Sequence, residues 1–282
     1  EFSKTAHGIE STLECIVASE ADAEGHRLTL RNRSARTRSI EVTSYGEIVL
    51  DLPAADHGHP AFSKMFVRTA IAGDLSSVTA RRNARGQEPV LHLAHLLCGG
   101  GTDRQAETDR RAFIGRGRRL GTAVTFDPAE RLTGTDGFTL DPVFALRRTL
   151  RIHPGAEVTL TYWTMVADDE AALDAAMRHY ADPAIFDHED RLAWTRSQVQ
   201  LRHIDSTLEE AAVFRAYASA LIYPDGGMAT RDPRIAAAVG PQSALWGFGI
   251  SGDCPIFVLR IDTAADLPIV REAMRMMLYF RH

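Results

Sequence analysis

Apolar residues change their spacing once along this chain, and that change limits its possible folds more than any other feature. Up to about Val166, apolar and polar residues alternate, as they do over 9–17 and 158–166. After Asp168, apolar residues recur every three or four positions instead. A period of two is typical of a strand, and a period of 3.6 is typical of a helix. A run of strands followed by a run of helices predicts separate β and α domains, not a doubly wound sheet.

The first part is expected to be an antiparallel β domain. Its alternation gives each strand one buried and one solvated face, as in antiparallel sheets with one wet side. Turns are indicated at 32–35 and at 153–156, where polar, proline and glycine residues interrupt the pattern. The expected strands are 9–17, 27–31, 40–52, 78–82, 90–97, 123–126, 144–152 and 158–166.

The second part is expected to be helical from Asp168, a suitable N-cap with acidic residues in the turn that follows. Residues 183–202 carry few apolar side chains among many charges, which indicates a partly exposed connecting helix. Amphipathic helices are expected at 208–222 and 267–280, and the methionine stripe of the second is interpreted as core. The predicted domains are a β-sandwich at 1–167, a helical linker at 168–205 and a helical domain at 206–282.

The charge balance of the 282 residues excludes several kinds of partner. A formal net charge of -5 and a pI near 6.1 provide no basic field to attract nucleic acid or an anionic membrane. No window approaches the ~20 apolar residues that cross a bilayer, so no direct membrane insertion is expected. Three widely spaced cysteines, Cys15, Cys98 and Cys254, argue against a disulfide framework and favour the cytoplasm.

The stretch from Trp246 to Pro255 is the strongest candidate for a ligand site. It places two aromatics, Trp246 and Phe248, together with glycines and the carboxylate of Asp253. Aromatic faces can stack on a sugar or a base, a carboxylate accepts hydrogen bonds from hydroxyls, and glycines such as Gly252 allow close backbone approach. Pro255 is expected to begin a new helix. The alternative is a glycine-rich link whose two aromatics belong to the core.

Other local patterns support no nucleophile, nucleotide or metal site. Ser251 lacks the glycine two residues later that a nucleophile elbow needs. The glycines at 115–121 miss the dinucleotide-binding spacing, and no phosphate loop with Gly-Lys-Ser/Thr occurs. The close histidine pairs lack a cysteine or carboxylate at zinc-site spacing, so they are interpreted as solvated loop and edge-strand histidines. These pairs are His57 with His59 and His92 with His95.

A cluster of arginines follows the middle of the β part. Planar guanidinium groups can hold phosphate or carboxylate in bidentate fashion, so an anion site is one interpretation. Glu107 and Asp109 lie close by in the sequence, which favours a structural ion-pair network instead. The cluster consists of Arg110, Arg111, Arg116, Arg118 and Arg119.

Residues 245–256 resemble the segment L-W-x-(aromatic)-G-I-S-G-D-x-P-I of glycoside hydrolase family 94, in the form found in cyclic β-1,2-glucan synthases. Further segments resemble the same family in the same order, so the resemblance covers nearly the whole chain. No single motif is specific, but the ordered set is. These segments are 7–10, 43–47, 59–63, 107–110, 113–118, 141–144 and 221–225.

The resemblance implies an N-terminal supersandwich like that of galactose mutarotases, a helical linker, and an (α/α)6 barrel of which 206–282 would supply only the first helices. It implies inverting phosphorolysis of β-glucosides, with β-1,2-glucan expected, inorganic phosphate as co-substrate and no cofactor. The implied partners are a β-glucan oligosaccharide and phosphate, and a homodimer is one assembly considered. The chain is interpreted as a segment of a larger parent protein. That parent protein is expected to be cytoplasmic, and an anchor in the inner membrane is one possibility that the resemblance raises.

The general acid of the resembled family belongs to an Asp-Trp-Asn-Asp-like motif. Trp163, Trp194 and Trp246 follow Tyr, Ala and Leu, so that motif is absent and the segment alone is predicted to be inactive. Asp253 is expected to hold sugar hydroxyls, although many family members carry Arg where this chain has Gly252. The alternative function is a non-catalytic carbohydrate-binding or scaffolding module. Sequence downstream that carries the acid motif would support the enzyme.

Overall fold

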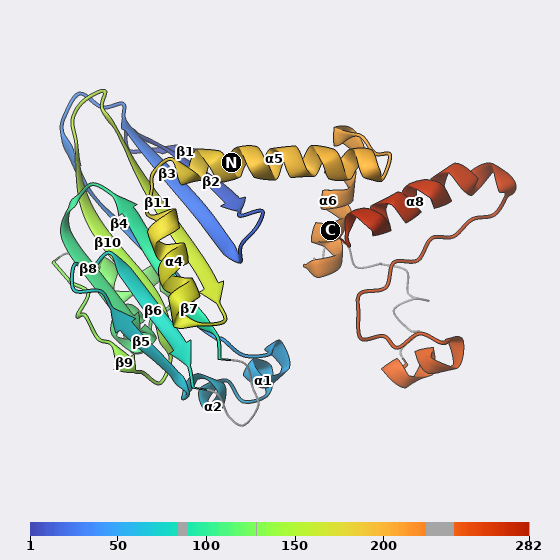
Figure 1. The fold of residues 1–282 in the computed structure, drawn as a ribbon, viewed down its shortest axis with the longest axis horizontal. Helices are drawn as coiled ribbons and strands as arrows, with labels where there is room; N and C mark the ends of the chain where they lie inside the picture. Colours follow the sequence, from blue (N-terminus) through green and yellow to red (C-terminus); the bar gives the residue numbers. More distant parts are fainter. Residues whose placement is uncertain (84–89, 128, 224–239, 282) are drawn as a thin grey trace. The chain divides into compact units, whose positions relative to one another are not determined.

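The computed structural model describes residues 1–83, 90–127, 129–223 and 240–281 (Figure 1). Its contacts divide the chain into two compact units, Glu1–Ala193 and Trp194–His282. All strands of the described residues belong to the first unit, and the described part of the second contains helices and irregular segments. The predicted succession of an antiparallel β-sandwich and then helices is confirmed.

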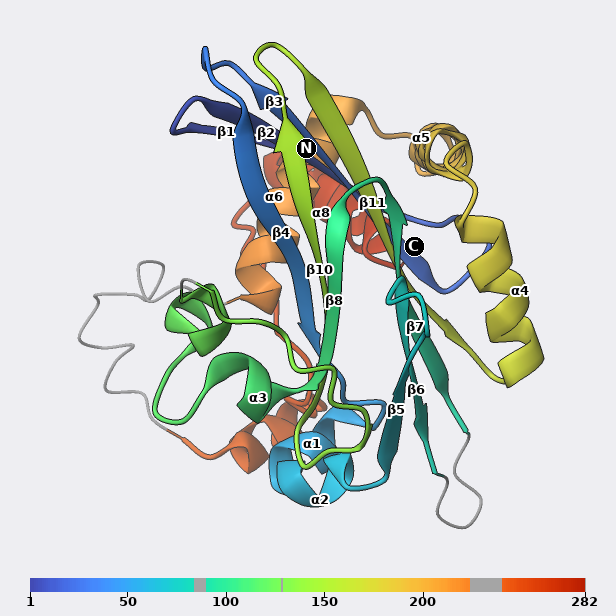
Figure 2. The same ribbon diagram turned by 90° about the vertical axis from the view of Figure 1, so that its left-hand side faces the viewer.

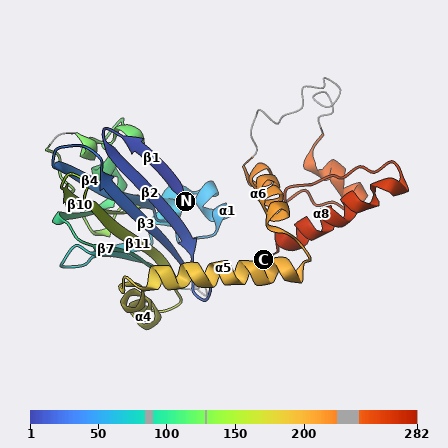
Figure 3. The same cartoon turned by 90° about the horizontal axis from the view of Figure 1, so that it is seen from above.

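The first unit contains two antiparallel sheets. Strands β1, β2 and β3 lie side by side in the larger sheet (Figure 3), and β10 lies between β4 and β8 in the smaller one (Figure 2). In spatial order, the eight-stranded sheet contains β1 (Phe2–Ala6), β2 (Ile9–Val17), β3 (Ala23–Asn32), β11 (Glu157–Ala167), β7 (His92–Gly99), β6 (Ser77–Arg82), β5 (Val67–Ile71) and β9 (Gly137–Phe138). The three-stranded sheet contains β4 (Arg38–Glu47), β10 (Pro142–Ile152) and β8 (Thr102–Asp109).

The main core of the sandwich lies between the two sheets. Leu97 and Leu160 of the larger sheet form one apolar cluster with Leu146 of β10. The opposite face of the larger sheet is covered in part by helix α4 (Glu170–Tyr180), against which Trp163 of β11 packs. Strands β7 and β11 are therefore largely buried on both faces, and the expectation of one wet face is wrong for them.

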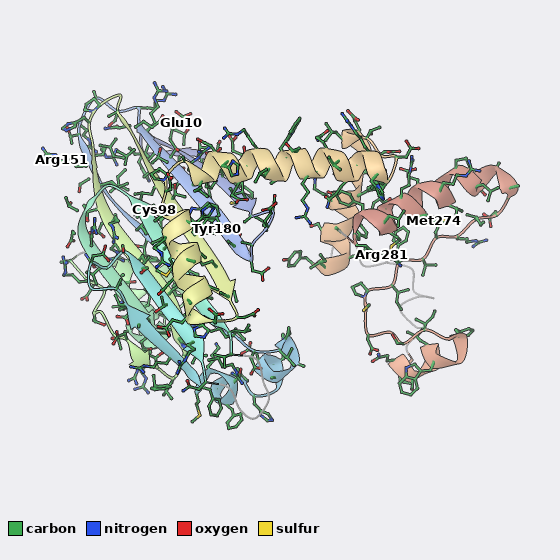
Figure 4. The ribbon with its side chains drawn as sticks, in the orientation of Figure 1. Glu10, Cys98, Arg151, Tyr180, Met274 and Arg281 are labelled. Carbon is green, nitrogen blue, oxygen red and sulfur yellow. The ribbon has the colours of Figure 1, made fainter. Side chains whose placement is uncertain are left out.

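Helix α4 begins at a side-chain cap and is held to the sheet by its last residue. The side chain of Asp169 accepts a hydrogen bond from the amide of Ala172 at 2.7 Å, so the predicted cap at Asp168 is wrong by one residue. The ring of Tyr180 lies 4.3 Å from that of Trp163, and its carbonyl accepts a hydrogen bond from Cys98 at 3.8 Å (Figure 4). Aromatic packing at this distance fixes one end of α4 on the sheet.

The free edge of β8 is covered by the segment 132–135. The carboxylate of Glu107 is fully buried and accepts hydrogen bonds from the amides of Thr108 and Asp109, both at 2.9 Å. It also accepts bonds from the amide of Thr133, at 3.1 Å, and from the Thr133 hydroxyl. An uncovered edge would present unpaired backbone groups to other chains, and this segment removes that liability.

The first unit also contains helices that the sequence did not predict, and one expected strand is helical. Residues 124–126 form a 3-10 helix, η2 (Val124–Phe126), where a strand was expected. The expected strand 40–52 stops at Glu47, because Leu50 has a φ of 50° and Pro53 begins helix α1 (Pro53–Gly58). The other unpredicted helices are α2 (Pro60–Lys64), α3 (Arg110–Ile114) and η1 (Leu120–Thr122).

The helices after the sandwich follow their predicted ranges closely. Helix α5 (Ile185–His203) crosses the boundary between the two units as a single helix. Helix α6 (Leu208–Ile222) begins with a capping box, in which Thr207 and Glu210 exchange two hydrogen bonds of 2.9 and 3.2 Å. The last elements are η4 (Gln242–Phe248), η5 (Ala264–Asp266) and α8 (Leu267–Tyr279).

Two expectations about the second unit need correction. Pro255 does not begin a helix, because residues 254–262 are irregular and η5 starts only after Thr263. The methionine stripe of α8 is core only at Met276, since Met274 (Figure 4) and Met277 are exposed. Helix packing in this unit places the ring of Tyr279 at 5.6 Å from that of Phe214 in α6.

Candidate functional site

The candidate sugar-binding loop spans Gln242 to Asp253 in the second unit. Its helical turn η4 ends at Gly249, whose φ of 72° is a left-handed conformation that glycine adopts without strain. The side-chain amide of Gln242 donates to the carbonyl of Ser251 at 2.8 Å and to Oδ1 of Asp253 at 2.9 Å. One glutamine therefore joins the start of the loop to its end and orients the carboxylate.

The two aromatics of this loop are exposed. The side chain of Trp246 is 65% exposed and that of Phe248 is 82% exposed. Trp246 is nevertheless fixed, because its indole N–H donates to the carbonyl of Ser251 at 3.3 Å. The aromatic rings offer flat apolar faces, and the carboxylate of Asp253 can accept further hydrogen bonds. This combination suits a ligand that has both C–H faces and hydroxyl groups.

Gly252 lies near the end of the loop in a left-handed conformation that favours glycine. Its φ is 77°, and a Cβ at this position would lie 2.9 Å from Cγ of Gln242. A larger residue there would displace the glutamine that orients Asp253. The hydroxyl of Ser251 accepts a bond from the amide of Asp253 at 3.4 Å, an arrangement that offers no general base for a nucleophile.

The two histidine pairs lie in different surroundings. In the parts of the chain that the structure describes, no three His, Cys, Asp or Glu side chains converge. His57 and His59 are exposed, but His92 and His95 are buried in the central strand β7, so the edge-strand interpretation is wrong for them. His95 bridges both sheets, with ring nitrogens bonded to Thr164 at 2.9 Å and to Ser44 at 2.8 Å.

His95 should make the sandwich less stable in mild acid. Burial lowers its pKa from 6.5 to about 3, with a smaller contribution from His26. The folded state keeps the ring neutral while the unfolded state takes up a proton, so stability is full above pH ~6.5 and falls below it. The stability advantage of wild type over His95→Gln should shrink by about 2 kcal/mol between pH 7 and pH 5 in urea unfolding. His57→Gln, at an exposed position, is the control and should show no such change.

Two of the five arginines in the cluster form ion pairs among the described residues, but not with the acids nearest in the sequence. Arg110 pairs with Glu47 at 2.8 Å and with Asp141 at 3.5 Å, and Arg118 pairs with Asp127 at 2.7 Å. Asp109 instead caps α3, and Glu107 accepts backbone amides. Arg110 and Arg118 therefore join separate segments of the sandwich.

A polar cluster that the sequence did not predict surrounds Arg110. It consists of Tyr45, Glu47, Lys64, Arg110 and Asp141, in which Tyr45 donates to Glu47 at 3.2 Å and Lys64 pairs with Asp141 at 2.8 Å. Burial and the Glu47 carboxylate raise the pKa of Tyr45 to about 12. For Glu47, burial is the largest single influence and opposes ionisation, but the bond and charge of Arg110, the Tyr45 bond and the Lys64 charge together outweigh it, so the pKa lies below its usual value. Partly exposed donors and acceptors of this kind can also hold a hydroxylated ligand.

Most of the charged residues of this cluster lie in segments that resemble glycoside hydrolase family 94 in sequence. Three of them, 43–47, 107–110 and 141–144, each supply one charged member. What the sequence lacked was the strand pairing of β4 with β10 and of β10 with β8, which brings these segments together.

The fold is thus an antiparallel supersandwich followed by helices, the class of carbohydrate-active domain that the ordered motifs indicated. Residues 1–183 match the model of the glycosyl hydrolase 94 supersandwich domain, and the chain belongs to glycosyl hydrolase family 94. It is 48% identical over 286 residues to the cyclic beta-(1,2)-glucan synthase NdvB of Rhizobium meliloti (strain 1021). That similarity covers 100% of this chain and 10% of the relative, so the chain spans about a tenth of the relative's length.

Solved structures show more distant likenesses. A polysaccharide lyase matches with a TM-score of 0.38 and 15% identity over 62% of this chain and 22% of its own. A protein assigned as a kojibiose phosphorylase, from the human microbiome, matches with a TM-score of 0.35 and 8% identity over 61% of this chain and 19% of its own. Among the described residues, no helix has the length and apolar character needed to cross a bilayer.

Proposed function

We propose that this chain is the N-terminal portion of a family 94 enzyme that phosphorolyses β-glucosides with inversion, with β-1,2-glucan as its substrate. Family membership supports the reaction class, and the 48% identical glucan synthase supports the glucan. The general acid lies outside residues 1–282 in this proposal. The proposed role of this segment is to bind and orient the sugar.

The proposed reaction needs one carboxylic acid and one phosphate. The acid gives its proton to the glycosidic oxygen as the bond to the anomeric carbon breaks, and a phosphate oxygen forms the new bond from the opposite face. Phosphate takes the place of the water and base of an inverting hydrolase. The residues of this chain would act before that step, by holding the glucosyl unit in place.

The observation that carries the proposal is the fixed loop 242–253. Exposed aromatic faces at Trp246 and Phe248 lie in the same short loop as the Asp253 carboxylate, and Gln242 holds that carboxylate in place. Sugar rings present a C–H face to aromatics and hydroxyl groups to carboxylates, so these two features match one ligand class.

The test is a phosphorolysis assay on the parent protein with β-1,2-glucooligosaccharides and inorganic phosphate. Sugar phosphate should be released, and Trp246→Ala should lower kcat/KM by about tenfold, the loss expected for one aromatic contact. Trp194→Ala is a matched control, because Trp194 is also 65% exposed but lies on α5 outside the loop. Equal losses in both variants would count against the loop as the sugar site.

The rival proposal, a non-catalytic carbohydrate-binding module, gives different results in the same assay. It expects glucan binding by the 282-residue chain and no phosphate-dependent turnover by the parent protein. Reducing sugar formed without phosphate would instead show hydrolysis. Turnover by the 282-residue chain alone would contradict the placement of the general acid outside it.

A further inference from the structure

A hollow on the outer face of the larger sheet has chemistry that the proposed reaction does not use. Its volume is about 420 Å³, within the range of small-molecule sites. Ala70 and Thr79, which face each other across β5 and β6, form a floor of small side chains. Helix α4 packs on the larger sheet against β7 and β11 (Figure 1). Its residues Glu170 and Asp174 line the hollow. We call this feature the α4 hollow.

One end of the α4 hollow gathers basic side chains. Arg68 of β5 lies directly opposite Arg81 of β6, and Arg81 lies directly opposite His92 of β7. Side chains directly opposite each other are about 5 Å apart at Cβ, and like charges in that arrangement destabilise a sheet. The two arginines therefore repel each other and destabilise the sheet here, and an anion bound between them would remove this repulsion.

These basic groups make few polar contacts with the described residues. Over the described residues, neither Arg68 nor Arg81 is in an ion pair, and Arg81 only donates to the Asn83 side chain at 3.3 Å. His92 is only 9% exposed, lines the hollow, and has no hydrogen-bond partner among those same residues. A ligand in the hollow could therefore contact the imidazole ring of His92.

The other wall has the opposite character. Glu170 and Asp174 lie one turn apart on α4 and face the hollow, and neither forms an ion pair within the described ranges. Ionised carboxylates only accept hydrogen bonds, so they suit ligand hydroxyls. Paired guanidinium groups suit an oxyanion, because each can donate two parallel bonds.

We propose that the α4 hollow binds a phosphorylated sugar. Its phosphate would lie between Arg68 and Arg81 beside His92, and its hydroxyls would donate to Glu170 and Asp174. None of these residues belongs to the loop 242–253, so the proposal does not depend on the proposed function.

The experiment is calorimetric titration of the 282-residue chain with glucose 6-phosphate, inorganic phosphate and glucose as separate probes. Glucose 6-phosphate should bind more tightly than either of the others. The double variant Arg68→Gln/Arg81→Gln should lose about tenfold or more in affinity for glucose 6-phosphate, since charge-assisted bonds are removed. Glu170→Gln/Asp174→Asn should weaken glucose 6-phosphate and leave inorganic phosphate unchanged.

Three controls make the outcome decisive. Asp253→Asn should bind glucose 6-phosphate as wild type does, which separates this site from the proposed sugar loop. Arg33→Gln, at an exposed pair with Glu10, should have no effect. The arginine double variant should melt at the same temperature as wild type or higher, because a like-charge contact is removed. Unchanged binding in that folded variant, or equal affinity for phosphate and glucose 6-phosphate, would overturn the proposal.

Discussion

Replacing Glu107 by glutamine should lower the free energy of unfolding of the sandwich by about 2–5 kcal/mol. The native carboxylate accepts four hydrogen bonds while fully buried, two from the amides of Thr108 and Asp109 and two from Thr133. Glutamine has the same shape, but its NH2 group would face two donors that then have no acceptor. Buried donors without a partner cost about 1–3 kcal/mol each.

Urea unfolding followed by near-UV circular dichroism measures this effect, and the melting temperature should fall by about 5–15 °C. Glu157→Gln is the matched control, because Glu157 is exposed on β11 and should change stability by less than about 0.5 kcal/mol. If the two variants were equally stable, the segment 132–135 would not depend on Glu107 for its attachment to β8.

The periodicity of the sequence predicted most of the strands and the long helices. It missed strands β1, β5, β8 and β9 and the short helices. In some of these elements a side chain, rather than a repeating pattern, determines the backbone. The strand β8 is one case, because Thr102–Asp109 is mainly polar and its inner positions are satisfied by segment 132–135. The helices α1 and α2 are another, since each is only one turn or so long and is signalled by a single proline.

Only part of the candidate site was predictable, because its composition is local in the sequence but its contacts are not. The aromatic, glycine and carboxylate composition of the loop is visible in the sequence, and so are Trp246 and Asp253. The role of Gln242 is not, because its bond to Asp253 spans eleven residues and depends on the left-handed turn at Gly249. The polar cluster around Arg110 likewise depends on strand pairing between distant segments.

The second large effect is expected at Asp253 in the complete enzyme. If its carboxylate accepts hydroxyl bonds from the glucosyl unit next to the scissile bond, each charged bond contributes about 1.5–3 kcal/mol. Asp253→Asn should therefore weaken productive binding by about tenfold to several hundredfold. The acid limb of the pH profile should remain, because the proton donor lies elsewhere. Steady-state kinetics of phosphorolysis across pH measures both quantities.

Gln242 provides the control for this interpretation. Gln242→Met keeps a side chain of similar length but removes the donor to Asp253, which lies 2.9 Å away. Gln242→Met alone should weaken binding. In the Asp253→Asn background it should weaken binding further by only about threefold or less, because both changes act on one carboxylate. Fully additive losses would show that Gln242 acts on the loop independently of Asp253. Loss of the acid limb in Asp253→Asn, with the rate restored by an activated leaving group, would make Asp253 the proton donor instead.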